Sequence, residues 1–132
     1  MKSFLSFFLL IISLGSLAQE NKIKVYLDCR CDENYIKQET SFLEYVRDQD
    51  LADVEIFIRD ERNPTGSRSF EIKIDGNNDY GEISNTTEAV GYANDTSSTL
   101  REKLLNKLKL ALVPFLEKAN YNLTIDVDSN FK

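Results

Sequence analysis

The sequence predicts an α+β fold: a single small domain with the element order β-α-β-β-(loop)-α-β, in which two helices pack on a mixed sheet. Three observations lead to this prediction. Several short segments alternate between apolar and polar residues, which is typical of strands, and two longer segments have helical apolar spacing. A chain of 132 residues leaves room for one domain only.

The amino terminus has the layout of a cleavable secretory signal peptide. Lys2 supplies a positive charge, residues 4–14 form an uncharged apolar run, and small residues occupy the −3 and −1 positions before a cleavage after Ala18. The apolar run is shorter than the ~20 residues that a membrane-spanning helix needs. We therefore expect residues 1–18 to be a signal peptide, residues 19–132 to form the domain, and the protein to be exported.

The first half of the domain is predicted to be a strand, a loop and a helix. Residues 22–27 alternate and predict the first strand. Residues 28–33 form a polar loop, in which Asp32 is placed to cap the helix that follows. Apolar residues spaced by seven and four positions predict that this helix covers residues 34–50.

A hairpin and a polar connection follow the first helix. Residues 54–59 and 69–75 alternate, and residues 63–66 between them contain Pro and Gly, so we expect an antiparallel hairpin. Residues 75–98 are rich in Gly, Asn, Asp, Thr and Ser. This composition predicts a long loop with one short strand at residues 82–84.

The last part of the chain is predicted to be a helix and a strand. Thr99 and Glu102 match a capping box, which places the helix start at Thr99. Pro114 lies inside the apolar pattern of this helix, so we expect a kink or a stop near Leu112. Residues 123–127 alternate and predict a final strand.

The composition argues against several functions. The sequence has 16 Lys and Arg against 22 Asp and Glu, a net charge of −6, whereas nucleic-acid binding needs clustered cations. It has no His, which excludes Ser-His-Asp and Cys-His nucleophile systems and His-ligated zinc. We therefore expect a non-enzymatic protein without a cofactor and without a nucleic-acid partner.

The two cysteines, Cys29 and Cys31, are separated by one residue. In an exported protein such thiols seldom stay reduced, so a local disulfide that fixes the loop, or two thiols with no role, is the interpretation we favour. A redox or thiol-exchange site is the second, although thioredoxin-like chemistry uses two intervening residues. A metal site is the third, and it would need further ligands.

The polar segment at residues 75–82 carries part of a calcium-loop pattern. Asp75, Asn77 and Asp79 match positions 1, 3 and 5 of such a loop, where oxygen ligands are needed. The match then fails, because Tyr80 stands where the loop has Gly and the late bidentate Glu is missing. The alternative is an ordinary turn between two strands.

A resemblance adds to these patterns. The segments that carry it are residues 25–29 (VYLDC), 32–39 (DENYIKQE), 42–48 (FLEYVRD), 52–56 (ADVEI) and 108–113 (LKLALV). Together they resemble the N-terminal region of exported bacterial proteins of unknown function, in which a small periplasmic α/β domain precedes an outer-membrane β-barrel. In that family two residues separate the cysteines, whereas this chain has one. The predicted element order is also similar to the N-terminal domain of the Tol–Pal translocation propeller protein.

The resemblance implies a periplasmic or outer-membrane-associated accessory or interaction domain of the bacterial cell envelope. Its partner would be a cell-envelope protein or a covalently linked outer-membrane barrel, and this chain would be the front part of a longer protein. Contact with the membrane would then occur only through the downstream region. Calcium or ligand binding by residues 75–82 and thiol redox chemistry at Cys29 and Cys31 stay open as alternatives.

Overall fold

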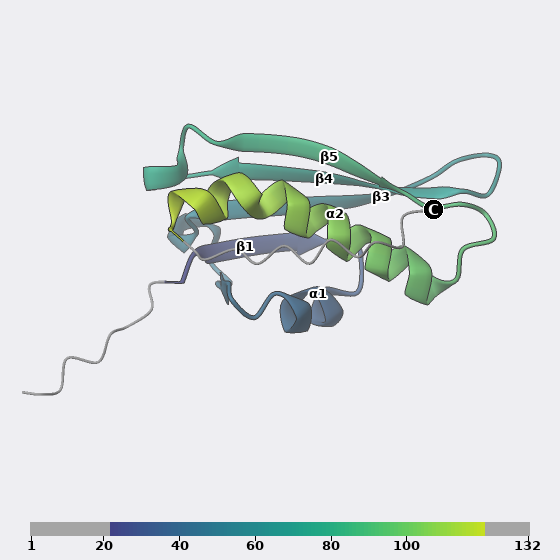
Figure 1. Ribbon diagram of the computed structural model, residues 1–132, viewed down its shortest axis with the longest axis horizontal. Coiled ribbons are helices and arrows are strands. Elements are labelled where there is room, and N and C mark those ends of the chain that lie inside the picture. The colour runs from purple at the N-terminus through teal and green to yellow at the C-terminus, as the bar shows by residue number, and fades with distance from the viewer. Residues whose placement is uncertain (1–21, 121–132) are drawn as a thin grey trace, which may run out of the picture.

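A five-stranded mixed sheet and two helices make up the computed structural model, which describes residues 22–120 (Figure 1). The strands are β1 (Lys24–Cys29), β2 (Glu44–Tyr45), β3 (Val54–Arg62), β4 (Arg68–Gly76) and β5 (Ser84–Val90). The helices are α1 (Glu33–Glu39) and α2 (Ser97–Lys118), with 3₁₀ turns η1 (Gln49–Leu51) and η2 (Asn78–Tyr80). The predicted fold class is confirmed. Ala18, the proposed signal peptide and the strand expected at residues 123–127 lie outside the described residues.

The strand order in the sheet is β2-β1-β3-β4-β5. β1 pairs in parallel with both β2 and β3, whereas β3, β4 and β5 form an antiparallel meander. The predicted hairpin is therefore confirmed, with strands slightly longer than expected. Its turn closes through a hydrogen bond from the Gly66 N–H to the Asn63 carbonyl, and Gly66 takes a φ of 84°, which favours glycine.

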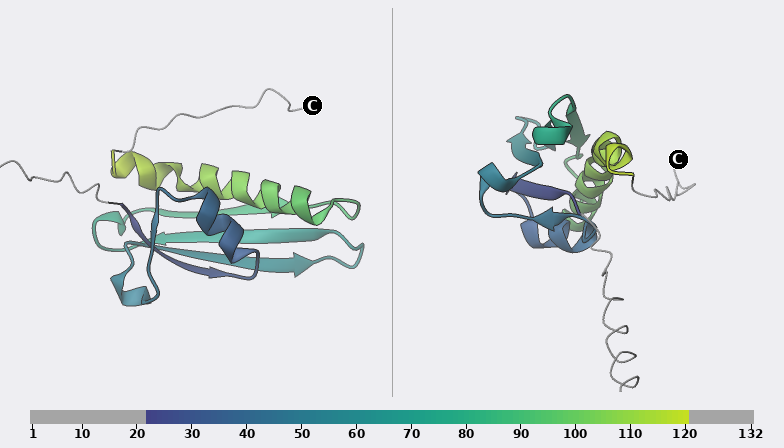
Figure 2. Two further views of the ribbon diagram at one scale, coloured as in Figure 1. Left: turned by 90° about the horizontal axis from the view of Figure 1, so that it is seen from below. Right: turned by 90° about the vertical axis from the view of Figure 1, so that its left-hand side faces the viewer.

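One face of the sheet forms the core. Alternate side chains of β1, β3 and β4 point to this face and are buried, and α2 lies along it (Figure 2). Ile36 of α1 is fully buried in the same core. The other face carries exposed and half-buried side chains, among them Tyr26 and Phe57, whose rings meet edge to face with centroids 6.4 Å apart. The fold is thus two layers deep, with one sheet face left to solvent in the described part.

The first helix is much shorter than predicted. α1 ends at Thr40, whose main-chain N–H and hydroxyl both donate to the Ile36 carbonyl. The chain then turns, buries Leu43 and pairs β2 with β1, so the prediction of one helix over residues 34–50 is wrong. The apolar residues after Thr40 face the core from a turn and an edge strand, which mimics helical spacing.

The long loop predicted at residues 75–98 is also wrong, because most of its middle is β5. This strand pairs with β4 over seven residues, from Ser84 opposite Asp75 to Val90 opposite Ser69. The side chains that β5 turns toward α2 are those of Asn85, Thr87 and Ala89. These side chains are small or polar, so the alternation has almost no hydrophobic contrast.

The second helix starts earlier and ends later than predicted. Thr96, not Thr99, is the N-cap, and its hydroxyl accepts a hydrogen bond from the Thr99 N–H at 3.1 Å. The helix continues through Pro114 to Lys118, so the predicted stop near Leu112 is wrong. Pro114 is on the exposed side, while leucines and Phe115 on the other side are buried against the sheet and hold the helix in place.

Candidate functional site

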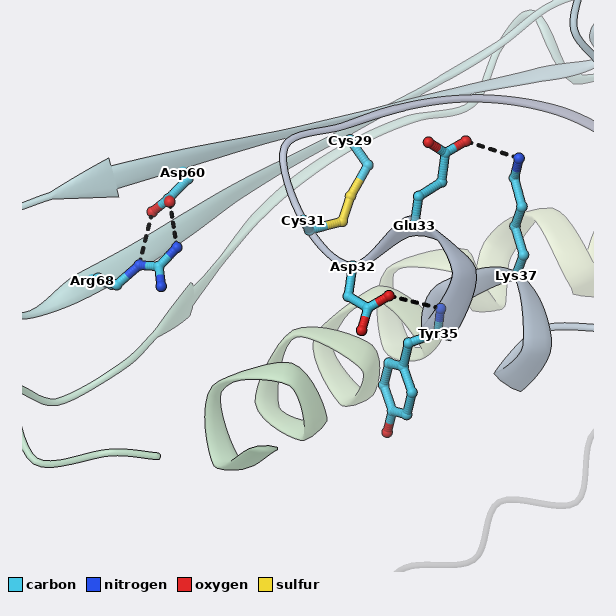
Figure 3. The surroundings of a disulfide bond; sticks show 8 residues. All are labelled: Cys29, Cys31, Asp32, Glu33, Tyr35, Lys37, Asp60 and Arg68. Atoms are coloured by element: carbon cyan, nitrogen blue, oxygen red, sulfur yellow. Dashed lines mark hydrogen bonds and ion pairs between the residues drawn. A yellow bond between two sulfur atoms is a disulfide. The ribbon is translucent and has the colours of Figure 1, made fainter. Parts of the chain in front are cut away.

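The disulfide loop connects β1 to α1 (Figure 3). Cys29 and Cys31 are bonded through their sulfur atoms, with their Cα atoms 5.2 Å apart. The Arg30 N–H donates to the Ile58 carbonyl at 3.1 Å, which ties the loop to β3. Asp32 accepts from the Tyr35 N–H at 3.2 Å, so the predicted helix cap is confirmed. The pairing fixes this loop locally, and a redox role for it stays a prediction.

A cleft of about 440 Å³ lies beside this loop. Its walls come from three separate parts of the chain: the disulfide loop with α1, the start of β4, and the first turns of α2. The residues that line it are Cys31, Asp32, Ile36, Arg68, Phe70, Ser97, Ser98, Leu100, Arg101 and Leu104. Cys31 of the disulfide therefore lines a partly polar hollow.

Both guanidinium groups of the cleft already have partners. Arg68 donates two hydrogen bonds to Asp60, which raises the pKa of Arg68 (Figure 3). Arg101 lies 3.3 Å from a carboxylate oxygen of Asp32, and its guanidinium carbon lies 4.1 Å from the centre of the Tyr35 ring. These pairs neutralise the charges of both guanidinium groups, although the Nε atom of Arg101 is buried and has no hydrogen-bond partner.

The three residues of the proposed calcium loop have separate surroundings and do not converge on one point. Asp75 pairs with Lys73 at 3.5 Å and accepts a hydrogen bond from the Ser84 hydroxyl at 3.1 Å. The Asn77 side chain donates to a main-chain carbonyl before β3, and Asp79 is exposed in η2. Among residues 22–120, no group of three or more His, Cys, Asp or Glu side chains could hold a metal ion. Calcium binding therefore stays a prediction that draws no support from this arrangement.

Of the two edge strands within residues 22–120, β5 has the longer outer edge, with seven residues against two in β2. Two hydrogen bonds define the orientation of the main chain in β5: the Gly76 N–H donates to the Ile83 carbonyl, and the Gly91 N–H donates to the Arg68 carbonyl. The main-chain N–H and C=O groups of the odd-numbered residues of β5 therefore point to β4. The even-numbered residues therefore point their main-chain groups outward. They are Ser84, Thr86, Glu88 and Val90.

This edge carries few of the features that normally prevent strand pairing. Natural edge strands are blunted by lysines, prolines, bulges or a covering segment. β5 contains no Lys and no Pro, Glu88 is its one charged residue, and no described strand pairs with its outer edge. At the opposite edge of the sheet, β2 has only two residues. Val90 and Tyr92 at the end of β5 leave 50% and 65% of their surfaces exposed.

Sequence reasoning missed both the cleft and the edge. The cleft depends on contacts between residues far apart in the chain, and the edge was expected to be a loop. The sequence matches no model of a known protein family, and no curated protein is significantly similar to it. No helix within residues 22–120 is long and apolar enough to cross a membrane.

Proposed function

We propose that this protein is an exported, non-enzymatic interaction domain of the bacterial cell envelope, which binds its partner by adding a strand to β5. The signal-peptide pattern and the family resemblance support the export and the envelope location. The observation that carries the binding mode is the outer edge of β5, a seven-residue strand with which no other strand within residues 22–120 pairs on that side. Strand addition of this kind is a common mode of peptide recognition.

The main-chain groups of β5 set the scale of the interaction. Four outward residues with one N–H and one C=O each provide eight groups for a partner strand. At about 0.5–1.5 kcal/mol net per hydrogen bond, these bonds contribute on the order of 4–12 kcal/mol. Fixing a flexible partner costs about 1–2 kcal/mol per residue, which offsets most of this gain. Main-chain pairing therefore gives weak binding by itself, and side-chain contacts must select the partner.

The binding mode can be tested by crosslinking in cells. A photoreactive residue at the exposed position Ser84 is expected to capture a specific envelope partner, identified by mass spectrometry. Thr86→Pro removes one outward N–H and leaves the hydrogen bonds to β4 intact, so it should abolish the crosslink. Thr86→Ala keeps that N–H and should retain it. Equal crosslinking by the Thr86→Pro variant would overturn the binding mode.

The export proposal has its own test. Cell fractionation followed by N-terminal sequencing is expected to find the protein in the envelope fraction, starting near Gln19. An intact chain in the cytosol that still carries residues 1–18 would contradict the proposed location.

Thiol–disulfide exchange is a second candidate, favoured by the position of Cys31 on the cleft wall. A thiolate of a dithiol partner would attack the Cys31 sulfur, and the Cys29 thiolate would leave. The second partner thiolate would then release reduced protein and a partner disulfide. Alkylation and mass spectrometry after incubation with a dithiol protein would detect this transfer. A permanently oxidised pair excludes it.

A further inference from the structure

We infer that the β5 edge selects an extended segment of a partner polypeptide with acidic residues at alternate positions, which it places beside the lysines of α2. This inference rests on the proposed strand addition and names the chemistry of the partner. It depends on which side chains of α2 lie along β5, and on the charges that the two faces of β5 present.

α2 runs antiparallel to β5 and lies over it. At one point the Asn85 side chain of β5 donates to the Ala111 carbonyl at 3.2 Å. At another, just beyond the end of β5, the Lys103 ammonium lies 2.6 Å from an Asp95 carboxylate oxygen. Lys107 is one helical turn from both Lys103 and Ala111, so it lies between these two contacts and follows the strand.

The side of α2 that follows β5 is basic. Lys103 and Lys107 are one helical turn apart on this side, and Lys118 lies on the same side about three turns further along; we call these three residues the lysine ridge. Glu102 falls on another side of the helix, whereas Glu117 lies within about 40° of Lys103 around the helix and belongs to the same side at its C-terminal end. Lys107 and Lys118 are exposed and have no ion pair with any residue of the described chain, whereas Lys103 is engaged by Asp95. Lys107 is therefore the unpaired cation of the ridge that lies along β5, because Lys118 lies about two turns past the contact of Ala111 with Asn85, beyond the start of the strand.

A strand added to β5 would place every second side chain on the α2 face of the sheet. These side chains would stand opposite Asn85, Thr87 and Ala89, which are neutral and turned toward α2. Acidic side chains at two of these positions can reach Lys107. On the other face, Glu88 disfavours a further carboxylate opposite or diagonal to it. The preferred partner therefore alternates acidic and neutral residues.

The net charge of the whole chain does not cancel this local preference. The chain carries a charge of −6, but ions at physiological salt screen exposed charges beyond about 8 Å. Lys107 lies between the two contacts that α2 makes along β5, so we expect it to contribute more to the potential at a docked strand than charges further away. We expect the preference for acidic segments to weaken as salt increases.

Two labelled seven-residue peptides test the inference on the full exported chain. The first, TDVDVDT, places three aspartates on one face, and the second, TNVNVNT, replaces them with isosteric asparagines. Fluorescence anisotropy at low and physiological salt should show about five- to tenfold tighter binding of the acidic peptide, since exposed ion pairs are individually weak. Lys107→Gln should remove most of this preference. Lys109→Gln, a control at another position around α2, should keep it.

The remaining outcomes separate the inference from the proposed function. Equal binding of both peptides that Thr86→Pro abolishes would overturn the acidic preference and leave strand addition in place. No binding of either peptide, together with crosslinks unaffected by Thr86→Pro, would overturn both. Sedimentation that finds a dimer abolished by Thr86→Pro would show that a second copy occupies the edge, and it would also overturn the acidic partner.

Discussion

Replacing Pro114 with alanine tests how α2 tolerates a proline in its last quarter. Pro114 has no N–H, so the Leu110 carbonyl lacks its helical hydrogen bond. A proline inside a helix is about 3 kcal/mol less favourable than alanine. Replacing proline with alanine also increases the conformational entropy of the unfolded chain, which reduces the gain in stability by about 0.4–1 kcal/mol. Because Pro114 is exposed, the core does not change. We expect Pro114→Ala to raise the free energy of unfolding by about 2 kcal/mol.

Urea unfolding followed by circular dichroism measures this change. In thermal unfolding of a domain near 100 residues, a change of 1 kcal/mol in the free energy of unfolding shifts Tm by about 4–8 °C. We therefore expect the Tm of Pro114→Ala to rise by about 8 °C or more. Lys109→Ala is the matched control: it is exposed on the same helix and should change stability by less than about 0.5 kcal/mol. An unchanged or lowered stability of Pro114→Ala, with the control neutral, would refute the reasoning that the proline interrupts an otherwise regular helix.

Three further predictions concern the core, the charges and the disulfide. Phe115 is fully buried, so Phe115→Ala should cost about 3–5 kcal/mol in urea unfolding, and a loss below 1 kcal/mol would contradict its core position. The hydrogen bond from Lys103, followed by one from a loop N–H, lowers the pKa of Asp95 below its ordinary 3.8. Its stabilising contribution is therefore present above pH 3.8 and lost as the pH falls through the lowered pKa. In NMR titration, Lys103→Met should move the pKa of Asp95 upward, and an unmoved pKa would reject this pair. The double change Cys29→Ser and Cys31→Ser opens a three-residue ring and should cost only about 1.5 kcal/mol in thermal unfolding, whereas complete unfolding would show a larger structural role.

The central strands β3 and β4 could be predicted because apolar side chains alternate with polar ones, as the buried and exposed faces of the sheet require. β3 and β4 have buried β-branched residues on one face and charged residues on the other, which gives strong alternation. β5 lacks this contrast, because Asn85 and Thr87 face a helix that one of them contacts through a hydrogen bond. A strand whose inner face is polar cannot be distinguished from a loop by hydrophobic pattern.

The candidate sites also differ in how far they could be predicted from the sequence. The neighbouring Cys29 and Cys31 are visible in the sequence because the bond is local. The cleft brings together Cys31, Arg68 and Arg101, and only the sheet register and the position of α2 make them neighbours. The lysines of α2 are visible as residues outside its apolar stripe, but their relation to the outer edge of β5 depends on β5 being a strand.

The mixed topology has a consequence for the order in which the chain gains structure. The β3–β4 hairpin closes between Arg62 and Arg68, six positions apart, whereas β1 meets β3 at Val25 and Val54, 29 positions apart. Loop-closure entropy makes the longer connection costlier by about 1.4 kcal/mol, so the meander should assemble before β1 joins it. During synthesis β1, the first of the described strands to be made, is thus among the last to dock. A ribosome-bound chain therefore exposes the apolar residues of β1 to chaperones until β5 ends at Val90, about sixty residues after the end of β1.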